Sequence, residues 1–345
     1  MNCTISPFGK IGNDKVFLYT FVTEDGLEIS ITNYGAIITA INLYPKGNER
    51  LNLAYGFENL QPYLNCNFYP GAIVGRYANR IAGAEFNIGD KHFHLTKNEG
   101  NNQLHGGFNG FNSKVWETHL FEQVNGVCTL RFFLRSPNLE EGFPGNLDVW
   151  VTYQITDDNQ ISINYAAITD QSTHVNLTSH GYFNLSGFHT DVLDHTLSIN
   201  ANHYLPVNEN LIPTGEIREL AGTPFDFRKT KAIGADIDLV DGVYDHCFVL
   251  NNPSLKEPSV ILKNPKIDVK LSVFTTQPGI QLYTPLRVPH INNSSTSIPT
   301  SGNWAVCIEP QHFPNTPNTP QFPTTLLKPN QEYNHTTILN FDLGD

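Results

Sequence analysis

Residues 147–167 read LDVWVTYQITDDNQISINYAA, and this stretch decides the fold class. Apolar and polar residues alternate along Leu147–Thr156 and again along Gln160–Ala167, which is the period-2 pattern of half-buried strands. Between them, Asp157-Asp158-Asn159 is a turn sequence. The stretch therefore predicts two antiparallel strands joined by a tight turn.

The same alternation continues on both sides of this hairpin. We expect further strands at Val16–Val22, Leu27–Thr32, Ile37–Leu43, Glu85–Ile88, Lys91–Leu95, Val127–Arg135, Asp194–Ile199, Cys247–Leu250, Ser259–Leu262, Ile267–Phe274, Ile280–Tyr283, Ala305–Glu309 and His335–Phe341. Convincing amphipathic helices are absent, and only Leu60–Leu64 and Ala232–Leu239 suggest single helical turns. Strands at this spacing, without helices between them, predict an all-β sandwich or barrel.

The chain shows no linker, composition break or internal repeat, so we expect one domain over residues 1–345. One stretch, Pro310–Pro329, is rich in proline. Proline has no N–H to donate to a strand ladder. We therefore expect an extended surface loop there and not a central strand.

Composition limits the partners of the chain. Its net charge of −12 argues against nucleic acids and anionic membranes, which need clustered Lys and Arg, and favours a neutral ligand. Five widely spaced cysteines without a CxxC pair indicate neither a disulfide framework nor a zinc knuckle. The first residues, MNCTISPFGKIGND, lack an apolar signal-peptide core, and no run approaches the roughly 20 apolar residues of a membrane helix. We expect a cytoplasmic protein.

Two histidines, His92 and His94, raise the question of a metal site. With Glu99 and Gly106 they nearly match the metal motif of cupin barrels, but Phe86 stands where that motif has a glycine, and no second half-motif follows. On a strand His92 and His94 share one face, so a solvated pair on an edge strand is the commoner explanation.

Other candidates for chemistry stand at dispersed strand ends. Glu309 closes the apolar strand that begins at Trp304, and a carboxylate there is costly unless it is partnered or functional. Asp245 stands at the entry to a strand, and Arg80 could equally form a surface ion pair. His180 lies in a polar island and is either functional or a satisfied core histidine. His105 precedes two glycines, which permit a tight turn or a close approach to a ligand.

Nine segments, in colinear order, carry a resemblance that runs from about residue 5 to residue 341. They are Asn33-Tyr34-Gly35-Ala36, Gly75-Arg76-Tyr77-Ala78-Asn79-Arg80-Ile81, Leu104-His105-Gly106-Gly107, Gly142-Phe143-Pro144-Gly145, Ser179-His180-Gly181-Tyr182-Phe183-Asn184-Leu185, Thr223-Pro224-Phe225-Asp226-Phe227-Arg228, Tyr244-Asp245-His246, Thr276-Gln277-Pro278-Gly279-Ile280-Gln281-Leu282-Tyr283-Thr284 and Ile308-Glu309-Pro310-Gln311. With these segments the chain resembles the aldose 1-epimerase (galactose mutarotase) family.

The resemblance implies a large antiparallel β-supersandwich and an enzyme that interconverts the α and β anomers of free hexoses such as galactose and glucose, as a monomer or homodimer. It implies Glu309 as general base, His180 as general acid and His105 as a second active-site histidine, without metal or other cofactor. The sugar-binding positions that it implies are Asn79, Arg80, Tyr182, Asp245 and Gln281, with His105 also contacting substrate. Ordinary pKa values suit an ionised Glu309 and a protonated His180 near neutral pH.

The sequence departs from the family pattern after Thr284, where Pro285-Leu286-Arg287 replace a usual Gly-Asn and a polar stretch, Ile291–Thr300, follows. This departure affects the expected sugar preference and leaves the catalytic positions unchanged. Four alternatives stay open: a non-catalytic carbohydrate-binding sandwich, a glycoside hydrolase that uses Asp245 and Glu309, a relative acting on hexose 6-phosphates, and the metal-dependent cupin.

Overall fold

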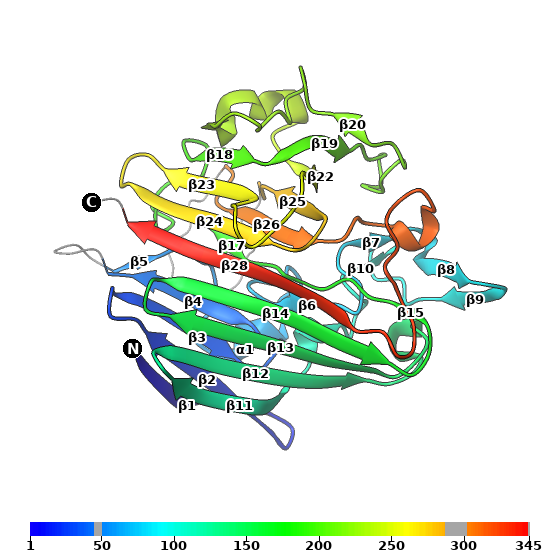
Figure 1. The fold of residues 1–345 in the computed structure, drawn as a ribbon, viewed down its shortest axis with the longest axis horizontal. Coiled ribbons are helices and arrows are strands. Elements are labelled where there is room, and N and C mark those ends of the chain that lie inside the picture. The colour runs from blue at the N-terminus through cyan, green and yellow to red at the C-terminus, as the bar shows by residue number, and fades with distance from the viewer. Residues whose placement is uncertain (45–49, 287–301, 344–345) are drawn as a thin grey trace.

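Three large antiparallel sheets carry most of the computed structural model, which describes residues 1–44, 50–286 and 302–343 (Figure 1). The largest sheet has, in spatial order, β11 (Glu117–Val124), β12 (Val127–Ser136), β13 (Leu147–Thr156), β14 (Gln160–Thr169), β28 (Tyr333–Leu343), β24 (Val269–Thr275), β23 (Val260–Asn264), β18 (Thr196–Ile199) and β21 (Lys231–Ala232). The second has β17 (Tyr182–Phe183), β26 (Val306–Gln311), β25 (Gly279–Tyr283), β22 (Asp245–Leu250), β19 (Ala201–Leu205) and β20 (Arg218–Glu219). The third has β1 (Asn2–Ile11), β2 (Asp14–Val22), β3 (Leu27–Thr32), β4 (Ile38–Leu43) and β5 (Leu51–Asn52).

Short elements connect these sheets. Paired two-residue strands are β6 (Ile73–Val74) with β16 (Thr178–Ser179), β7 (Arg80–Ile81) with β10 (Gln103–Leu104), and β15 (Thr173–His174) with β27 (Leu326–Leu327). A separate hairpin consists of β8 (Glu85–Ile88) and β9 (Lys91–His94). The helical elements are α1 (Leu60–Leu64) and the 3₁₀ turns η1 (Ala82–Ala84), η2 (Phe111–Ser113), η3 (Glu140–Gly142), η4 (Ile233–Val240) and η5 (Thr316–Asn318). The all-β prediction is confirmed.

The hairpin that decided the fold class has the predicted form. Its register pairs Thr156 with Gln160 around the turn and continues to Leu147 opposite Thr169. Along β14, every second residue from Ile161 to Ala167 is buried. Their side chains therefore point from one face of the sheet into the core.

One hydrophobic cluster lies between the sheets and includes buried residues from Tyr19 in β2 to Phe341 in β28. Polar contacts also cross from the N-terminal sheet to the largest one: Tyr19 Oη lies 2.6 Å from Thr118 Oγ1, and Tyr153 Oη donates to the Ala36 carbonyl at 2.6 Å. These contacts pack the N-terminal sheet against the β11–β13 half of the largest sheet, giving a layered sandwich. The single-domain organisation stays a prediction.

Two long strands, β1 and β11, were not expected from the sequence. Both lie at the edge of a sheet, where most side chains are exposed, so apolar alternation is weak. β1 also contains Pro7 and a register shift between Pro7 and Gly9. Proline and bulges are typical of edge strands and hide them from pattern-based prediction.

The expectation of a surface loop over Pro310–Pro329 is wrong at its start. Pro310 lies inside β26, opposite Ile280 of β25. On the other side of β26, the short strand β17 pairs only with Val306 and Cys307. Pro310 therefore needs no N–H to donate a hydrogen bond to β17. Residues 311–316 are buried, and Phe313 packs with Phe322 at a ring-centroid distance of 5.3 Å.

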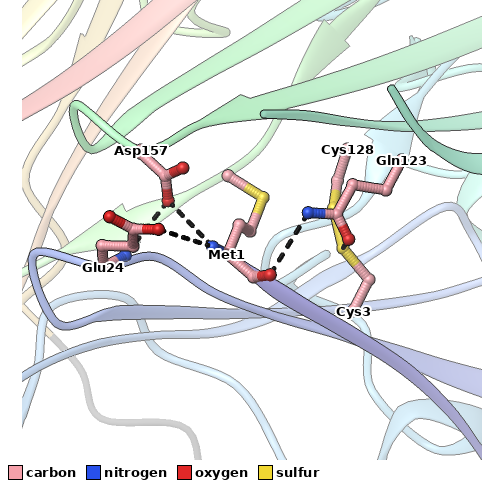
Figure 2. Close-up of a disulfide and its surroundings, with 6 residues drawn as sticks. All are labelled: Met1, Cys3, Glu24, Gln123, Cys128 and Asp157. Carbon is pink, nitrogen blue, oxygen red and sulfur yellow. Dashed lines mark hydrogen bonds and ion pairs between the residues drawn. A yellow bond between two sulfur atoms is a disulfide. The ribbon is translucent and has the colours of Figure 1, made fainter. Parts of the chain in front are cut away.

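A disulfide joins Cys3 of β1 to Cys128 of β12, a pairing that cysteine spacing did not indicate (Figure 2). Beside it, Gln123 Nε2 donates to the Met1 carbonyl at 3.2 Å. The Met1 amine lies 3.5 Å from Glu24 Oε1 and 3.4 Å from Asp157 Oδ1. These contacts attach the edge strand β1 to the largest sheet.

Within the described ranges, the structure has no helix with the length and apolar character needed to cross a membrane.

Several histidines are buried in neutral form. Burial lowers the pKa of His174, His195 and His312 to about 4 each. An unfolded chain exposes these rings, whose pKa then returns to about 6.5. As the pH falls from about 6.5 toward 4, the unfolded state therefore takes up protons that the folded state does not, and the folded state loses stability.

We predict that the free energy of unfolding, measured by urea titration between pH 7 and pH 4, falls steeply over this range. His195→Gln removes one such proton and should lower the slope by up to about 1.4 kcal/mol per pH unit. The matched control is His189→Gln, at an exposed position. An unchanged slope in His195→Gln would contradict the assignment.

Candidate active site

A cavity of about 600 Å³ opens where the six-stranded sheet meets the short strands β7 and β10. Its lining includes all eight residues that the sequence singled out as catalytic or sugar-binding: Asn79, Arg80, His105, His180, Tyr182, Asp245, Gln281 and Glu309. Segments separated by more than 200 residues in the chain thus meet at one cavity.

The six-stranded sheet supplies its side chains through register. Gln281 of β25 lies opposite Glu309 of β26, and Tyr283 lies opposite both Cys307 and Asp245. Paired residues, and residues two apart on one strand, point to the same face. Asp245, Gln281 and Glu309 therefore project together into the cavity.

Two loop residues form the opposite wall by contacting each other. The Asn79 amide N–H donates to His105 Nδ1 at 3.2 Å, and the His105 amide N–H donates to the Asn79 carbonyl at 3.1 Å. Both residues have left-handed backbones, with φ of 63° and 52°. Non-glycine residues adopt this conformation uncommonly, and it tends to gather at functional sites. Because Nδ1 accepts a hydrogen bond, the neutral His105 ring carries its proton on Nε2.

The glycine after His105 lies in the tight turn that the sequence offered as one alternative, and the Gly107 amide N–H donates to the Leu104 carbonyl at 3.1 Å. Gly106 has φ of 88°, and a Cβ there would clash with the Gly75 carbonyl oxygen. The close approach is therefore between two loops of the protein and not between backbone and ligand. Arg76, next to Gly75, is buried, and its guanidinium donates to the Pro144, Gly145 and Ser136 carbonyls at 2.9–3.2 Å.

His180 and Glu309 lie at the base of the cavity. His180 Nε2 is 3.8 Å from Glu309 Oε1, and the two residues are 5% and 2% exposed. Among the described residues, neither His180 Nδ1 nor Glu309 Oε2 has a hydrogen-bond partner. The reading of His180 as a satisfied core histidine is therefore not supported, because buried polar atoms are normally paired.

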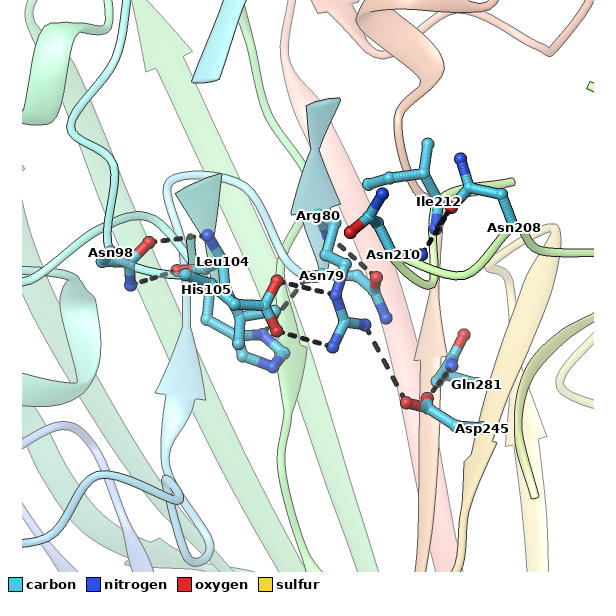
Figure 3. Close-up of polar contacts among 11 residues, drawn as sticks. Asn79, Arg80, Asn98, Leu104, His105, Asn208, Asn210, Ile212, Asp245 and Gln281 are labelled. Atoms are coloured by element: carbon cyan, nitrogen blue, oxygen red, sulfur yellow. Dashed lines mark hydrogen bonds and ion pairs between the residues drawn. The ribbon is translucent and has the colours of Figure 1, made fainter. Parts of the chain in front are cut away.

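Arg80 is held by two carboxylates. Its Nε and Nη2 donate to the two oxygens of Glu99 at 2.8 Å each, and its Nη1 lies 3.9 Å from Asp245 Oδ2. Gln281 Nε2 donates to Asp245 Oδ1 at 2.6 Å, so Arg80, Asp245 and Gln281 form one chain of polar contacts (Figure 3). The sequence considered Glu99 only as a metal ligand; in the structure it orients Arg80.

Burial sets the charge state of the site. Burial raises the pKa of Glu309 well above its ordinary value, with Asp245 adding to the rise and Arg80 opposing it. Burial also lowers the pKa of His180 to about 4 and that of His105 well below its usual range. Both shifts disfavour ions, so burial opposes the expectation of an ionised Glu309 beside a protonated His180. The shifts favour placing a proton that the pair shares on Glu309.

Aromatic side chains form one wall of the cavity, and of these the sequence singled out only Tyr182. Tyr69 packs on His105 at 4.8 Å and on His180 at 5.9 Å between ring centroids, and Tyr182 stacks between His180 and Trp304. Tyr283 also lines the cavity. Tyr283 belongs to one of the segments that carried the family resemblance, whereas no pattern around Tyr69 indicates a role.

In the part of the chain that the structure describes, two groups of side chains have metal-ligand character. His105, His180 and Glu309 bring ligand-type atoms within 4.8 Å of one another, and so do Glu85, His92 and His94. In the first group, His105 Nδ1 already accepts from Asn79 and its Nε2 carries the proton, so this ring has no free lone pair for a metal. The first group therefore does not fit a metal. Of the divergent loop, Ile291–Thr300 lies outside the described residues.

Comparison with known proteins identifies the architecture. The family model described as aldose 1-epimerase matches residues 18–340. A galactose mutarotase of Mus musculus is 41% identical over 347 residues, covering 100% of each chain, and an aldose 1-epimerase of Haemophilus influenzae is 37% identical over 313 residues, covering 88% of this chain and 89% of the relative. A crystal structure of an aldose epimerase homologue from C. elegans superposes with a TM-score of 0.87 at 27% identity, covering 95% of this chain and 99% of that one.

These similarities extend over nearly the whole length of the chain, and the cavity lies among the segments that carry the resemblance. The match includes strands of all three sheets, with β1 outside it, and the loops that bear Asn79, Arg80 and His105. The galactose mutarotase-like β-sandwich is thereby confirmed as the fold. The chain belongs to the aldose 1-epimerase family of isomerases.

Proposed function

We propose that this protein interconverts the α and β anomers of a free hexose by acid–base opening and reclosure of the ring, with His180 and Glu309 as the proton-transfer pair. The observation that carries the proposal is the 3.8 Å approach of His180 Nε2 to Glu309 Oε1 at the base of a cavity, each side chain retaining an unpartnered polar atom among the described residues. Side chains that transfer protons need free atoms that face substrate.

The reaction needs one proton removed from the C1 hydroxyl and one proton added to the ring oxygen O5. Both of these oxygen atoms are bonded to C1. In the family-based assignment Glu309 takes the hydroxyl proton and His180 donates to O5. A sugar hydroxyl that donates to Glu309 stabilises the carboxylate and favours moving the shared proton to His180. The free enzyme and the reactive complex then differ in where one proton sits, and the total number of protons stays the same.

His105 is the donor that we propose assists at the developing carbonyl. Its Nε2–H is a donor because Nδ1 accepts from the Asn79 amide, and burial keeps the ring neutral. We propose that this N–H hydrogen-bonds the oxygen on C1 as the ring opens. Arg80, Asp245, Gln281, Asn79 and Tyr182 are proposed to hold the remaining hydroxyls, so that C1 can turn while the rest of the sugar stays fixed.

A neutral sugar suits the charges of the cavity. Arg80 is the only Lys or Arg side chain that lines the described cavity, and it is already bound to Glu99 and close to Asp245. A hexose phosphate would need an additional cation. The glycoside hydrolase reading loses support because Asp245 Oδ1 accepts from Gln281, a contact that supports a binding role for this carboxylate. Galactose and glucose remain the substrates to compare.

We also propose a cytoplasmic location. Cys66, Cys247 and Cys307 are free, which accords with a reducing compartment, whereas the Cys3–Cys128 disulfide is the feature that favours an oxidising one.

Substituting either member of the pair should lower kcat while sugar binding survives. Glu309→Gln removes the carboxylate and His180→Asn removes the imidazole, and each change should lower the polarimetric kcat for freshly dissolved α-galactose by at least about 100-fold. Binding of galactose, measured by calorimetry, should change little because Asn79, Arg80 and Gln281 remain. His189→Gln is the control and should retain full activity. If Glu309→Gln kept more than a tenth of kcat, Asp245 would become the candidate base.

The pH dependence should show the unusual charge state of the pair. The competent form carries one proton, so kcat/KM should fall when His180 gains a second proton, as the pH approaches about 4, and when Glu309 loses the last one above its raised pKa. Ordinary pKa values instead place the acid limb near the Glu value and the basic limb at about 6.5. Initial rates between pH 4.5 and 9, with circular dichroism to confirm folding, separate the two cases. A basic limb at about 6.5 would contradict a neutral His180.

Arg80→Ala should act mainly on binding. Removing hydrogen bonds from a charged group costs about 1.5–3 kcal/mol, which corresponds to a rise in KM of roughly 10–100-fold. Because these contacts are shared by ground and transition states, kcat should change less. Glu99→Gln, which leaves the arginine in place but weakens its anchor, should give a smaller rise in KM. A loss confined to kcat would contradict a binding role.

A further inference from the structure

The hairpin β8–β9 lies at the edge of the molecule, away from the three large sheets (Figure 1). One of its faces is buried: Phe86 packs against Phe93 and Phe143, with ring centroids 5.6 and 5.9 Å apart. The register pairs Glu85 with His94 and Asn87 with His92. Strand alternation therefore gathers these four polar side chains on the opposite, exposed face.

Three of these side chains bring their ligand atoms together. His92 Nε2 is 3.3 Å and His94 Nδ1 is 3.6 Å from the same oxygen of Glu85, Oε2. Two ligands on one tetrahedral zinc ion, each about 2.1 Å from the metal, are roughly 3.4 Å apart. The spacing is that of neighbouring ligands on one ion, and all three side chains are open to solvent.

The fourth side chain fixes the tautomer of His92. Asn87 Oδ1 lies 2.8 Å from His92 Nδ1 and accepts its proton, which leaves Nε2 with a free lone pair that faces Glu85. An acceptor on the second nitrogen is the usual support for a metal-bound imidazole. Lys91 occurs at the alternate register position with Phe93, so strand alternation directs it toward the other face.

We propose that Glu85, His92 and His94 form a surface site for a divalent transition metal, zinc being the best match to two imidazoles and one carboxylate with water in the fourth position. The carboxylate comes from the paired strand. Glu99, which linear spacing suggested, instead binds Arg80. The site is separate from the proposed sugar cavity, and the proposed isomerase reaction does not depend on a metal bound there.

The test is calorimetric titration of the chelator-treated, full-length protein with ZnCl₂. Wild type should bind one ion saturably, and Glu85→Gln, His92→Gln and His94→Gln should each weaken binding at least about tenfold. Asn87→Ala, which keeps all three ligands but frees the His92 tautomer, should weaken it by about tenfold. The matched control is His119→Gln, because His119 Nε2 lies 3.5 Å from Glu117 Oε2 in an exposed pair with only one imidazole.

Absence of saturable binding in wild type, or wild-type affinity in all three ligand variants, would overturn the proposal. Circular dichroism confirms that each variant is folded. Glu309→Gln should bind zinc as wild type does, and chelation should leave the polarimetric rate of wild type unchanged. A metal-site failure and a failure of the isomerase mechanism therefore give different results.

Discussion

Burial of the Glu309 carboxyl is the constraint on which the rest of the site depends. Removing an isolated carboxylate from water costs several kcal/mol, so such a group must be protonated or faced by a compensating charge. Arg80 supplies the opposing charge, while Asp245 acts in the other direction, and burial outweighs both. The result is a buried carboxyl and a buried imidazole for which burial favours a shared proton on Glu309. Small changes in hydrogen bonding can then decide which of them holds it.

The charge of Arg80 opposes the rise in the Glu309 pKa, and the guanidinium is held in place by several contacts. Glu99 binds it with two hydrogen bonds, and the loop before it is tied to His105 in both directions. Gly106 lets this loop pack directly against the Gly75 backbone, next to the buried Arg76. Two left-handed residues are held here by their neighbours, which is the usual way that a protein maintains a locally unfavourable backbone at a functional site. Rigid strands carry one wall of the cavity, and a supported loop carries the other.

The hairpin β8–β9 lies in the chain between Arg80 and Glu99, the two residues of the ion pair. After Arg80 the chain leaves the cavity and forms the hairpin, and it then returns toward the cavity at Glu99, which accepts hydrogen bonds from Arg80. Packing of the buried Phe86 and the partly buried Phe93 under the hairpin leaves Glu85, Asn87, His92 and His94 on its outer face. Linear spacing joined His92 and His94 to Glu99 because it could not include strand pairing, and strand pairing joins them to Glu85.

The sequence by itself determined the all-β class, most of the long strands and, through nine colinear segments, the family and eight of the residues that line the cavity. Alternation succeeds where one face of a strand is buried, as in 147–167, since burial imposes the period-2 pattern. Alternation failed for β1 and β11, because both faces of these strands are largely exposed. The proline rule failed for Pro310, because β17 pairs with β26 only at Val306 and Cys307 and does not reach the proline. Only the tertiary structure decided the Cys3–Cys128 pairing, the aromatic wall of Tyr69, the role of Glu99 and the charge state of His180 and Glu309. Each of these depends on which residues meet in space and on how much water they exclude, and a pKa is set by that burial and not by the type of side chain alone.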